Sequence, residues 1–215
     1  MNESATATPA MPLRAALEVL HAVRRDEAVL TTMSPAREWQ AISRHPLDLC
    51  HIPSCMGHTS AIGLGLALAQ PRRQVIVLNG DGSLLMSLGN LVTIAAAARD
   101  KPPLTNFTLV LCDNGVYEVT GRQRTPGRDV DFIGLARASG FEQVWGFDNL
   151  PAWRDTVREV LASPGPRFVH LRVEPQWDEQ NLAVPMRETI TAQIARLREH
   201  LAKNAECGPS ARCVR

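Results

Sequence analysis

Apolar residues along the chain follow two alternating spacings. Over 13–23 they recur every three or four residues, which is the period of an α-helix that buries one face. Short unbroken runs such as Val75–Leu78 are rich in β-branched residues, which is typical of strands buried on both faces. Strands are predicted at about 28–31, 47–52, 75–78, 107–112, 141–145 and 168–173. Helices are predicted at about 13–23, 34–43, 57–69, 84–98, 132–138, 152–161 and 184–201.

This alternation predicts a doubly wound α/β domain, with a mostly parallel sheet covered by helices on both faces. Ligands of such sheets bind beyond the carboxyl ends of the strands. We therefore expect chemistry in the loops after Leu78 and after Cys112. Both ends of the chain, 1–11 and 204–215, are rich in small and polar residues and are predicted to be disordered, which leaves one domain over 12–203.

Composition excludes several classes of protein. The chain has 215 residues, of which 45% are hydrophobic and 21% charged, as in an ordinary globular protein rather than a fibre or a disordered chain. A net charge of +1 gives no reason to expect nucleic acid or a membrane surface as a partner. No apolar run spans a bilayer and no leader is evident, so we expect a cytoplasmic protein. The five scattered cysteines fit reduced thiols better than a disulfide framework.

The first candidate loop, Asn79–Ser83, lies between a strand and a helix. A Gly-Asp-Gly turn at this place directs backbone N–H groups at a ligand, an arrangement that suits phosphate oxygens. Asp81 alone would repel phosphate, but it is a natural ligand of Mg²⁺, which can bridge the two. A plain β-turn whose aspartate caps the helix explains the same residues equally well.

The second candidate loop, Cys112–Tyr117, follows the next buried strand. Asn114 offers an amide oxygen and a nearby turn carbonyl offers another, so one cation could bind both loops at once. Taken by itself, Asp-Asn-Gly is a commonplace turn.

Taken together, Gly80-Asp81-Gly82 and Asp113-Asn114 resemble the signature of thiamine-diphosphate-dependent enzymes. The resemblance covers most of the chain and implies their pyrophosphate-binding (PP) domain. It implies that Mg²⁺ is held by Asp81, Asn114 and the Val116 carbonyl, and that Gly80, Gly82 and Ser83 bind the cofactor diphosphate. Thirty residues, from Ser83 to Cys112, separate the motifs. This gap is slightly longer than usual in the family, and the Pro-rich stretch 99–106 accounts for the surplus.

The segment 54–63, which reads SCMGHTSAIG, resembles the stretch of these enzymes that contacts the aminopyrimidine. The resemblance implies cofactor contacts at Ser54, Met56 and Gly57, with the Met56 side chain wedged against the bent cofactor. Methionine suits this role because it is polarizable and adaptable. An ordinary core position is the other explanation for Met56.

The amino-acid sequences of these segments are most similar to those of the sulfopyruvate and phosphonopyruvate decarboxylases of this superfamily. That similarity implies a carboxy-lyase acting on a small anionic 2-oxo acid, with His58 as a catalytic proton shuttle and with Tyr117 and Glu118 near the cofactor. A helix-start histidine bound to backbone explains His58 as well, and a solvated loop carboxylate explains Glu118. Arg122 and Arg124 are further candidates, for contact with an anion.

Thiamine catalysis also requires a carboxylate at the aminopyrimidine, which in this superfamily comes from a pyrimidine-binding domain. Such a domain needs about 150 residues, for which the predicted elements leave no room. We therefore expect a β subunit that forms an oligomer with a separately encoded pyrimidine-binding (α) subunit. Two alternatives stay open: the β subunit of an acetolactate-synthase-like or 2-oxoacid oxidoreductase enzyme, and a noncatalytic cofactor-binding subunit.

Overall fold

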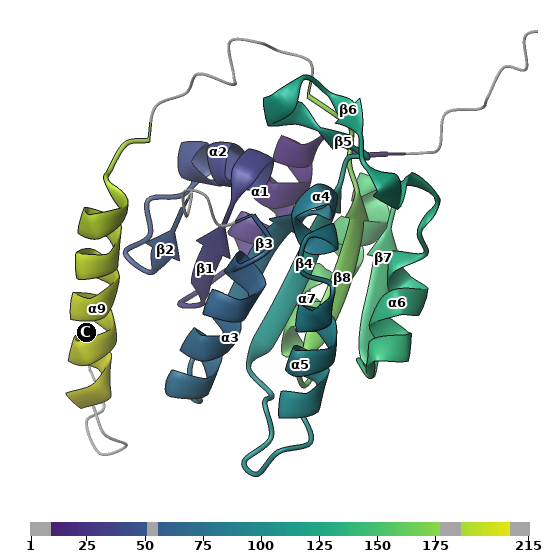
Figure 1. Cartoon of the computed structure of the whole chain (residues 1–215). Coiled ribbons are helices and arrows are strands. Elements are labelled where there is room, and N and C mark those ends of the chain that lie inside the picture. The colour runs from purple at the N-terminus through teal and green to yellow at the C-terminus, as the bar shows by residue number, and fades with distance from the viewer. Residues whose placement is uncertain (1–9, 51–55, 177–185, 207–215) are drawn as a thin grey trace, which may run out of the picture.

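The computed structural model describes residues 10–50, 56–176 and 186–206, and its elements follow the predicted alternation of helices and strands (Figure 1). The helices are α1 (Leu13–Val23), α2 (Met33–Ile42), α3 (Thr59–Ala69), α4 (Asp81–Leu85), α5 (Gly89–Ala97), α6 (Phe132–Ser139), α7 (Leu150–Ala162) and α9 (Ile190–Glu206). The strands are β1 (Ala28–Thr31), β2 (Asp48–Leu49), β3 (Val75–Gly80), β4 (Phe107–Asp113), β5 (Val116–Tyr117), β6 (Gln123–Arg124), β7 (Gln143–Phe147) and β8 (Arg167–Arg172). No helix in these parts of the chain is long and apolar enough to cross a membrane.

Six of the strands form one parallel sheet in the order β2-β1-β3-β4-β8-β7. The strand order reverses between β1 and β3, because the chain adds β2 on one side of β1 and then returns to place β3 on the other. A parallel sheet brings the carboxyl ends of β1, β3 and β4 to one edge, where a doubly wound fold binds its ligands. The predicted fold class is confirmed.

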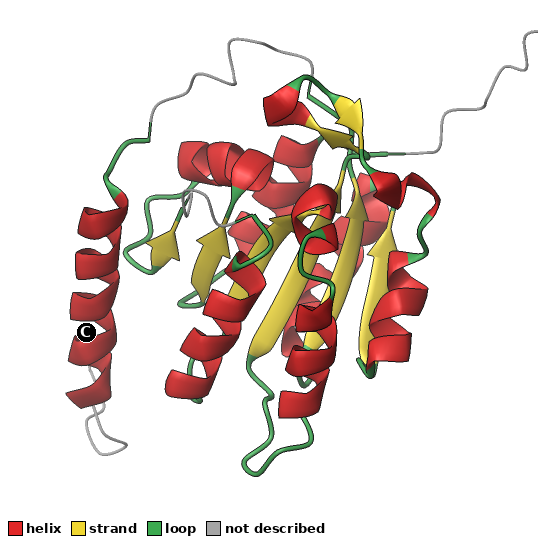
Figure 2. Ribbon diagram, in the orientation of Figure 1, coloured by secondary structure: helices red, strands yellow, loops and turns green. Residues whose placement is uncertain are grey.

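Helices cover both faces of the sheet (Figure 2). Successive residues of a strand point to opposite faces. Val75 and Val77 of β3 pack in one apolar cluster with α3, α5, α6 and α9. Ile76 and Leu78 pack in a second cluster with α1, α2 and α7. Burial on both faces explains why the strands read as continuous apolar runs rather than as alternating ones.

Several predicted boundaries are wrong in detail. The helix predicted over 84–98 is two helices, α4 and α5, interrupted where Gly57 lies against Met86 and Ser87. Within the described residues, the strand predicted at 47–52 is reduced to β2, and the one at 141–145 is shifted to β7. The small antiparallel pair β5 and β6 was not predicted, because each strand has only two residues, too few to show a periodic pattern.

Met11 belongs to the folded domain, although the sequence placed it in a disordered N-terminal segment. Its side chain is buried, its N–H donates to the Arg172 carbonyl, and its carbonyl accepts from Glu174 N–H, so the chain here runs beside the end of β8. At the other end, α9 extends to Glu206, three residues past the predicted domain boundary. The other residues predicted to be disordered, 1–9 and 207–215, lie outside the described part of the chain.

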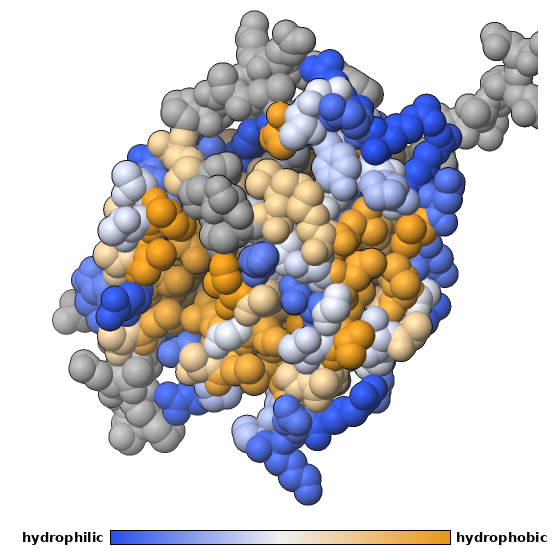
Figure 3. All heavy atoms as spheres, viewed as in Figure 1, coloured by the Kyte–Doolittle hydropathy of each residue, from blue (hydrophilic) through white to orange (hydrophobic). Residues whose placement is uncertain are grey.

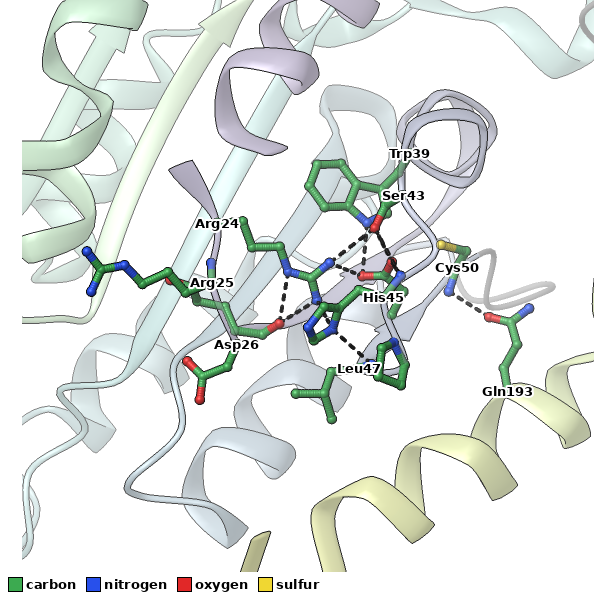
Figure 4. Close-up of polar contacts among 12 residues, drawn as sticks. Arg24, Arg25, Asp26, Trp39, Ser43, His45, Leu47, Cys50 and Gln193 are labelled. Atoms are coloured by element: carbon green, nitrogen blue, oxygen red, sulfur yellow. Dashed lines mark hydrogen bonds and ion pairs between the residues drawn. The ribbon is translucent and has the colours of Figure 1, made fainter. Parts of the chain in front are cut away.

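Buried polar contacts hold the edge strand β2 (Figure 4). The Asp48 carboxylate accepts hydrogen bonds from Arg24 Nη1 at 2.6 Å, from Trp39 Nε1 at 3.1 Å and from Ser43 Oγ. The Arg24 guanidinium also lies over the Trp39 ring, 5.7 Å from its centroid. Burial and the neighbouring Arg24 charge lower the pKa of His45, whose Nδ1 accepts a hydrogen bond from Arg24 Nη2 at 3.1 Å.

Helix α9 is attached to the same edge by two side chains. Gln193 Oε1 accepts from Cys50 N–H at 2.7 Å, as Figure 4 shows, and Arg196 donates to the carbonyls of His45, Pro46 and Asp48. These contacts satisfy backbone groups that an exposed edge strand would leave unpaired. Helix α9 therefore closes this side of the sheet.

Candidate functional site

A pocket lies at the carboxyl edge of the sheet. Its walls come from the ends of β3 and β4, from the loop after β4 and from the start of α2. The lining residues are Leu13, Met33, Ser34, Pro35, Met56, Gly80, Asp81, Gly82, Ser83, Cys112, Asn114, Val116, Tyr117, Glu118, Val119 and Val173. The two predicted loops and Met56 therefore meet in one place, although thirty residues, from Ser83 to Cys112, span the gap between the two loops.

Asp81 occupies the first position of α4, directly after β3, and its side chain is buried. Its pKa is raised from 3.8 to about 6, mainly by burial and also by the Asp113 carboxylate, although a hydrogen bond from Thr125 Oγ1 at 2.6 Å acts in the opposite direction. No basic side chain forms an ion pair with Asp81 in the described structure. A buried carboxylate without a counter-charge is a strong candidate for binding a cation.

The turn after β4 presents oxygen atoms to the same pocket. Gly115 has φ +71°, a left-handed conformation that glycine adopts without strain, and it turns the chain back toward β3. Asn114 Oδ1 accepts from Val116 N–H at 3.0 Å, and both residues line the pocket. The turn therefore offers an amide oxygen and main-chain carbonyls, which are suitable ligands for a hard cation.

Glu118 is buried and fixes the orientation of Asn114. Its carboxylate accepts from Asn114 Nδ2 at 2.8 Å, from Arg37 Nη2 at 2.8 Å, from Gln176 N–H at 2.8 Å and from Ser34 Oγ. Because the amide nitrogen of Asn114 is engaged by Glu118, the amide oxygen, which accepts from Val116 N–H, keeps a second lone pair for a further contact. The alternative of a solvated loop carboxylate is therefore wrong for Glu118, since tertiary contacts that its local sequence does not reveal surround it.

Gly57 and Ser83 join the Met56 segment to the turn after β3. Gly57 has φ +83°, its N–H donates to Ser83 Oγ at 2.9 Å, and its carbonyl accepts from Asn90 Nδ2 at 2.9 Å. Met56, directly before it, is partly buried and lines the pocket. These contacts set the position of Met56 relative to Asp81.

Gly82 allows an aromatic ring to approach the turn. A Cβ atom at this position would lie 2.3 Å from Tyr117 Cε1, so any side chain would displace the ring. Tyr117 belongs to β5, whose pairing with β6 also brings Thr125 back toward Asp81. The second glycine of the Gly-Asp-Gly motif is thus needed for packing inside the pocket.

Five of the residues singled out in the sequence are not among the described lining residues of the pocket, and one of them is Gly57, which lies beside Met56. Ser54 lies outside the described residues. His58 is exposed at the residue before α3, where its carbonyl accepts from Ile62 N–H, and its catalytic role stays a prediction. Arg122 does not line the pocket. Arg124 lines an adjoining cavity, together with Arg128, Arg172 and the turn 113–116.

The structure also brings residues to the pocket that were missed in the sequence. Met33 has φ +55°, an uncommon conformation for a non-glycine residue, and with Ser34 it places the start of α2 at the pocket wall. Thr125 lies 44 residues from Asp81, and no local motif links the two. Cys112 is a buried thiol whose pKa is raised to about 12 by burial, so it is inert at neutral pH.

The donors in the pocket fit a divalent cation that is shared with an anionic ligand. Two carboxylates, Asp81 and Glu118, and no Lys, Arg or His are found among the described lining residues. A phosphate group can enter such a pocket only together with a cation. Nowhere in the described residues do three His, Cys, Asp or Glu side chains gather as a metal site, so the cation would depend on amide, carbonyl and phosphate oxygens beside Asp81.

Comparison with protein families identifies this arrangement. Residues 28–171 match the family described as "Thiamine pyrophosphate enzyme, C-terminal TPP binding domain". The chain belongs to this family. The match runs from β1 to β8 and includes both loops of the pocket, so the predicted cofactor, thiamine diphosphate (thiamine pyrophosphate), is confirmed at the level of the family.

Two curated relatives of this thiamine pyrophosphate enzyme domain are decarboxylases. The chain is 40% identical over 161 residues to "Sulfopyruvate decarboxylase subunit beta" of Methanothermobacter thermautotrophicus, which covers 74% of this chain and 80% of that one. It is 39% identical to "Phosphonopyruvate decarboxylase" of Streptomyces viridochromogenes over 77% of this chain, but over only 41% of that protein. The predicted resemblance is therefore confirmed.

A solved structure shows the same fold. It is described as a putative thiamin diphosphate-dependent enzyme from Mycobacterium smegmatis, with a TM-score of 0.65 and 22% identity. The likeness covers 77% of this chain and 32% of that chain. At this identity the comparison supports the fold alone.

Proposed function

We propose that this chain is the PP-domain (β) subunit of a heteromeric decarboxylase that uses thiamine pyrophosphate and Mg²⁺ and acts on a small anionic 2-oxo acid. The observation that carries the proposal is the meeting of Asp81, Asn114 and Val116 in one pocket of a domain that belongs to the thiamine pyrophosphate enzyme family. The names of the two relatives support decarboxylation, with sulfopyruvate and phosphonopyruvate as the first substrates to test.

The chain's own residues would hold the diphosphate end of the cofactor. Asp81, the Asn114 amide oxygen and the Val116 carbonyl would bind Mg²⁺, with Glu118 keeping the Asn114 amide in the required orientation. Ser83 and the backbone of Gly80 and Gly82 line the adjoining surface, and Met56 packs toward the rest of the cofactor. When bound, thiamine pyrophosphate supplies the electron sink that decarboxylation requires.

A second subunit would complete the site. The two carboxylates of the pocket lining are already engaged, Asp81 by Thr125 and Glu118 by Ser34, Arg37, Asn114 and Gln176. Neither is free to serve at the aminopyrimidine, so we assign that role to a separately encoded pyrimidine-binding (α) subunit. The word "subunit" in the name of the Methanothermobacter relative supports this arrangement, and a cytoplasmic location stays a prediction.

The proposal is tested by calorimetry followed by a turnover assay. The purified chain should bind thiamine pyrophosphate weakly and only with Mg²⁺, and Asp81→Ala should abolish that binding while the circular dichroism spectrum is unchanged. Release of CO₂ from sulfopyruvate or phosphonopyruvate should require the α subunit as well. Full turnover by the single chain would contradict the divided site, and Mg²⁺-independent binding would contradict the metal assignment.

A further inference from the structure

A second cavity adjoins the cofactor pocket and contains three arginine side chains. Arg124, Arg128 and Arg172 line it, together with the turn 113–116 that follows β4. Asn114 of this turn also lines the cofactor pocket, so the turn is a wall that the two cavities share. The described lining of the cofactor pocket has no basic side chain, whereas the second cavity, which we call the arginine cavity, is rich in positive charge.

Three separate segments bring these arginines together. Arg124 lies on β6, where it pairs with Val116 of β5. Arg128 lies in the 3₁₀ helix Pro126–Asp129, and Arg172 is the last residue of β8. Because each arginine belongs to a hydrogen-bonded element, the fold itself sets the positions from which the three side chains reach the cavity.

The arginine cavity carries more positive charge than its own acidic groups neutralise. Asp113 is the one acidic residue of the described lining, and it is buried. Its Oδ2 atom lies 2.9 Å from His170 Nε2 and 3.6 Å from Arg172 Nη1. Neither Arg124 nor Arg128 forms an ion pair within the described residues. Three guanidinium groups therefore share one carboxylate.

The surroundings of the cavity do not supply the missing negative charge. Asp129 and Glu174 are close in the sequence, but neither lines the cavity and neither forms an ion pair in the described structure. In Figure 3, blue hydrophilic atoms gather at the upper right, where β6 lies in Figure 1. Like charges around one cavity raise the local concentration of counter-ions. The arrangement therefore attracts an anion.

The guanidinium group suits a particular kind of anion. Its N–H donors form a planar fork that can bind two oxygens of a phosphate group at once. Several such forks around one cavity match a tetrahedral oxyanion, which offers oxygens in several directions. No metal ion is needed here, in contrast to the cofactor pocket, where the carboxylates of Asp81 and Glu118 would repel a bare phosphate group.

We propose that the arginine cavity is a binding site for a small tetrahedral oxyanion, which Arg124, Arg128 and Arg172 hold without a metal ion. The site is additional to the cofactor pocket and does not depend on the proposed decarboxylation. Arg124, a candidate from the sequence for contact with an anion, would thus meet that anion outside the cofactor pocket. Two sources share this chemistry: free phosphate or sulfate, and the phosphonate or sulfonate group of a small organic acid.

Calorimetry of the full chain tests the site. Inorganic phosphate, sulfate and phosphonopyruvate are titrated separately in a metal-free buffer of low ionic strength. The proteins are the unaltered chain, Arg124→Gln, Arg128→Gln and Arg137→Gln. Arg137 is a matched control because it is an exposed arginine of α6 that does not line the arginine cavity. Circular dichroism and the midpoint of urea unfolding check that each variant folds as the unaltered chain does.

The unaltered chain should bind at least one of the three anions saturably, with one site per chain and without Mg²⁺. Arg124→Gln and Arg128→Gln should each weaken this binding by about 10-fold or more, because each removes a charge-assisted hydrogen bond, and Arg137→Gln should bind normally. Tighter binding of phosphonopyruvate than of phosphate would assign the site to an organic acid, and the reverse order would assign it to the free ion. Both orders support the site.

Four results would overturn the proposal. The first is no saturable binding of any of the three anions, and the second is binding that all three variants retain. The third is an equal loss of affinity in Arg137→Gln, because it would reflect only the overall charge of the chain. The fourth is binding that appears only with Mg²⁺, because it would place the anion in the cofactor pocket. None of these results decides the proposed decarboxylase activity, which is measured with thiamine pyrophosphate and the α subunit.

Discussion

Replacing Asp81 by asparagine should make the cofactor-free chain more stable and its cofactor binding weaker. The Asp81 carboxylate is 2% exposed and has no basic partner among the described residues, so the folded chain must hold a buried charge at neutral pH. Asparagine has nearly the same shape and can keep the hydrogen bond from Thr125 Oγ1. It removes the charge that binding of Mg²⁺ requires.

The magnitude follows from the pKa of Asp81. Burial raises this pKa from 3.8 to about 6, and each pKa unit corresponds to about 1.4 kcal/mol between the two protonation states. The favourable contribution of protonated Asp81 is complete below pH 3.8 and is lost as the pH rises through about 6. At pH 7 the variant should therefore exceed the original chain by up to about 3 kcal/mol in free energy of unfolding.

Urea unfolding between pH 4 and 7.5 measures this difference. The two chains should be nearly equal at pH 4 and should diverge up to pH 6 to 7. Addition of Mg²⁺ and thiamine pyrophosphate at 100 times the dissociation constant should stabilise the original chain by about 2.7 kcal/mol and the variant far less. In the original chain, cofactor affinity should fall below pH 6, because protons compete with Mg²⁺ for Asp81.

Two results would refute this reasoning. A constant difference in stability between the chains from pH 4 to 7.5 would mean that Asp81 does not titrate with a raised pKa. Equal stabilisation of both chains by Mg²⁺ and thiamine pyrophosphate would mean that the Asp81 charge does not bind the metal.

Three further substitutions test other parts of the structure. Gly82→Ala places a Cβ 2.3 Å from the Tyr117 ring and should cost about 1–3 kcal/mol in urea unfolding and weaken cofactor binding, whereas normal binding would show that the ring can move freely. Glu118→Gln should lower cofactor affinity by about 10- to 100-fold in calorimetry, because Asn114 loses its charged acceptor, and an unchanged affinity would contradict that role. Arg196→Ala should increase hydrogen exchange of α9 and β2 amides while cofactor affinity is retained, because the bonds from Arg196 to three carbonyls hold α9 at the sheet edge, and unchanged exchange would show that they do not.

Part of the candidate site could be predicted from the sequence, and part of it could not. The two turns that contain Asp81, Asn114 and Val116 could be predicted from the sequence, because glycine-containing turns at strand ends have a local signature. Thr125, Ser34 and Arg37 carry no such signature, since each acts through a partner at least 44 residues away. The assignment of Glu118 changed for the same reason, because four donors from three separate segments surround it.

The fold, too, has features that the sequence predicts and features that only the structure reveals. The sequence by itself determined the alternation of helices and strands and the parallel sheet, because burial on both faces selects continuous apolar strands with a period that can be read locally. Only the tertiary structure decided the strand order, the break between α4 and α5 at Gly57, and the short pair β5 and β6 that brings Thr125 to Asp81. These features depend on contacts between distant segments, and such contacts form when the chain closes around its core, so no single stretch of residues encodes them.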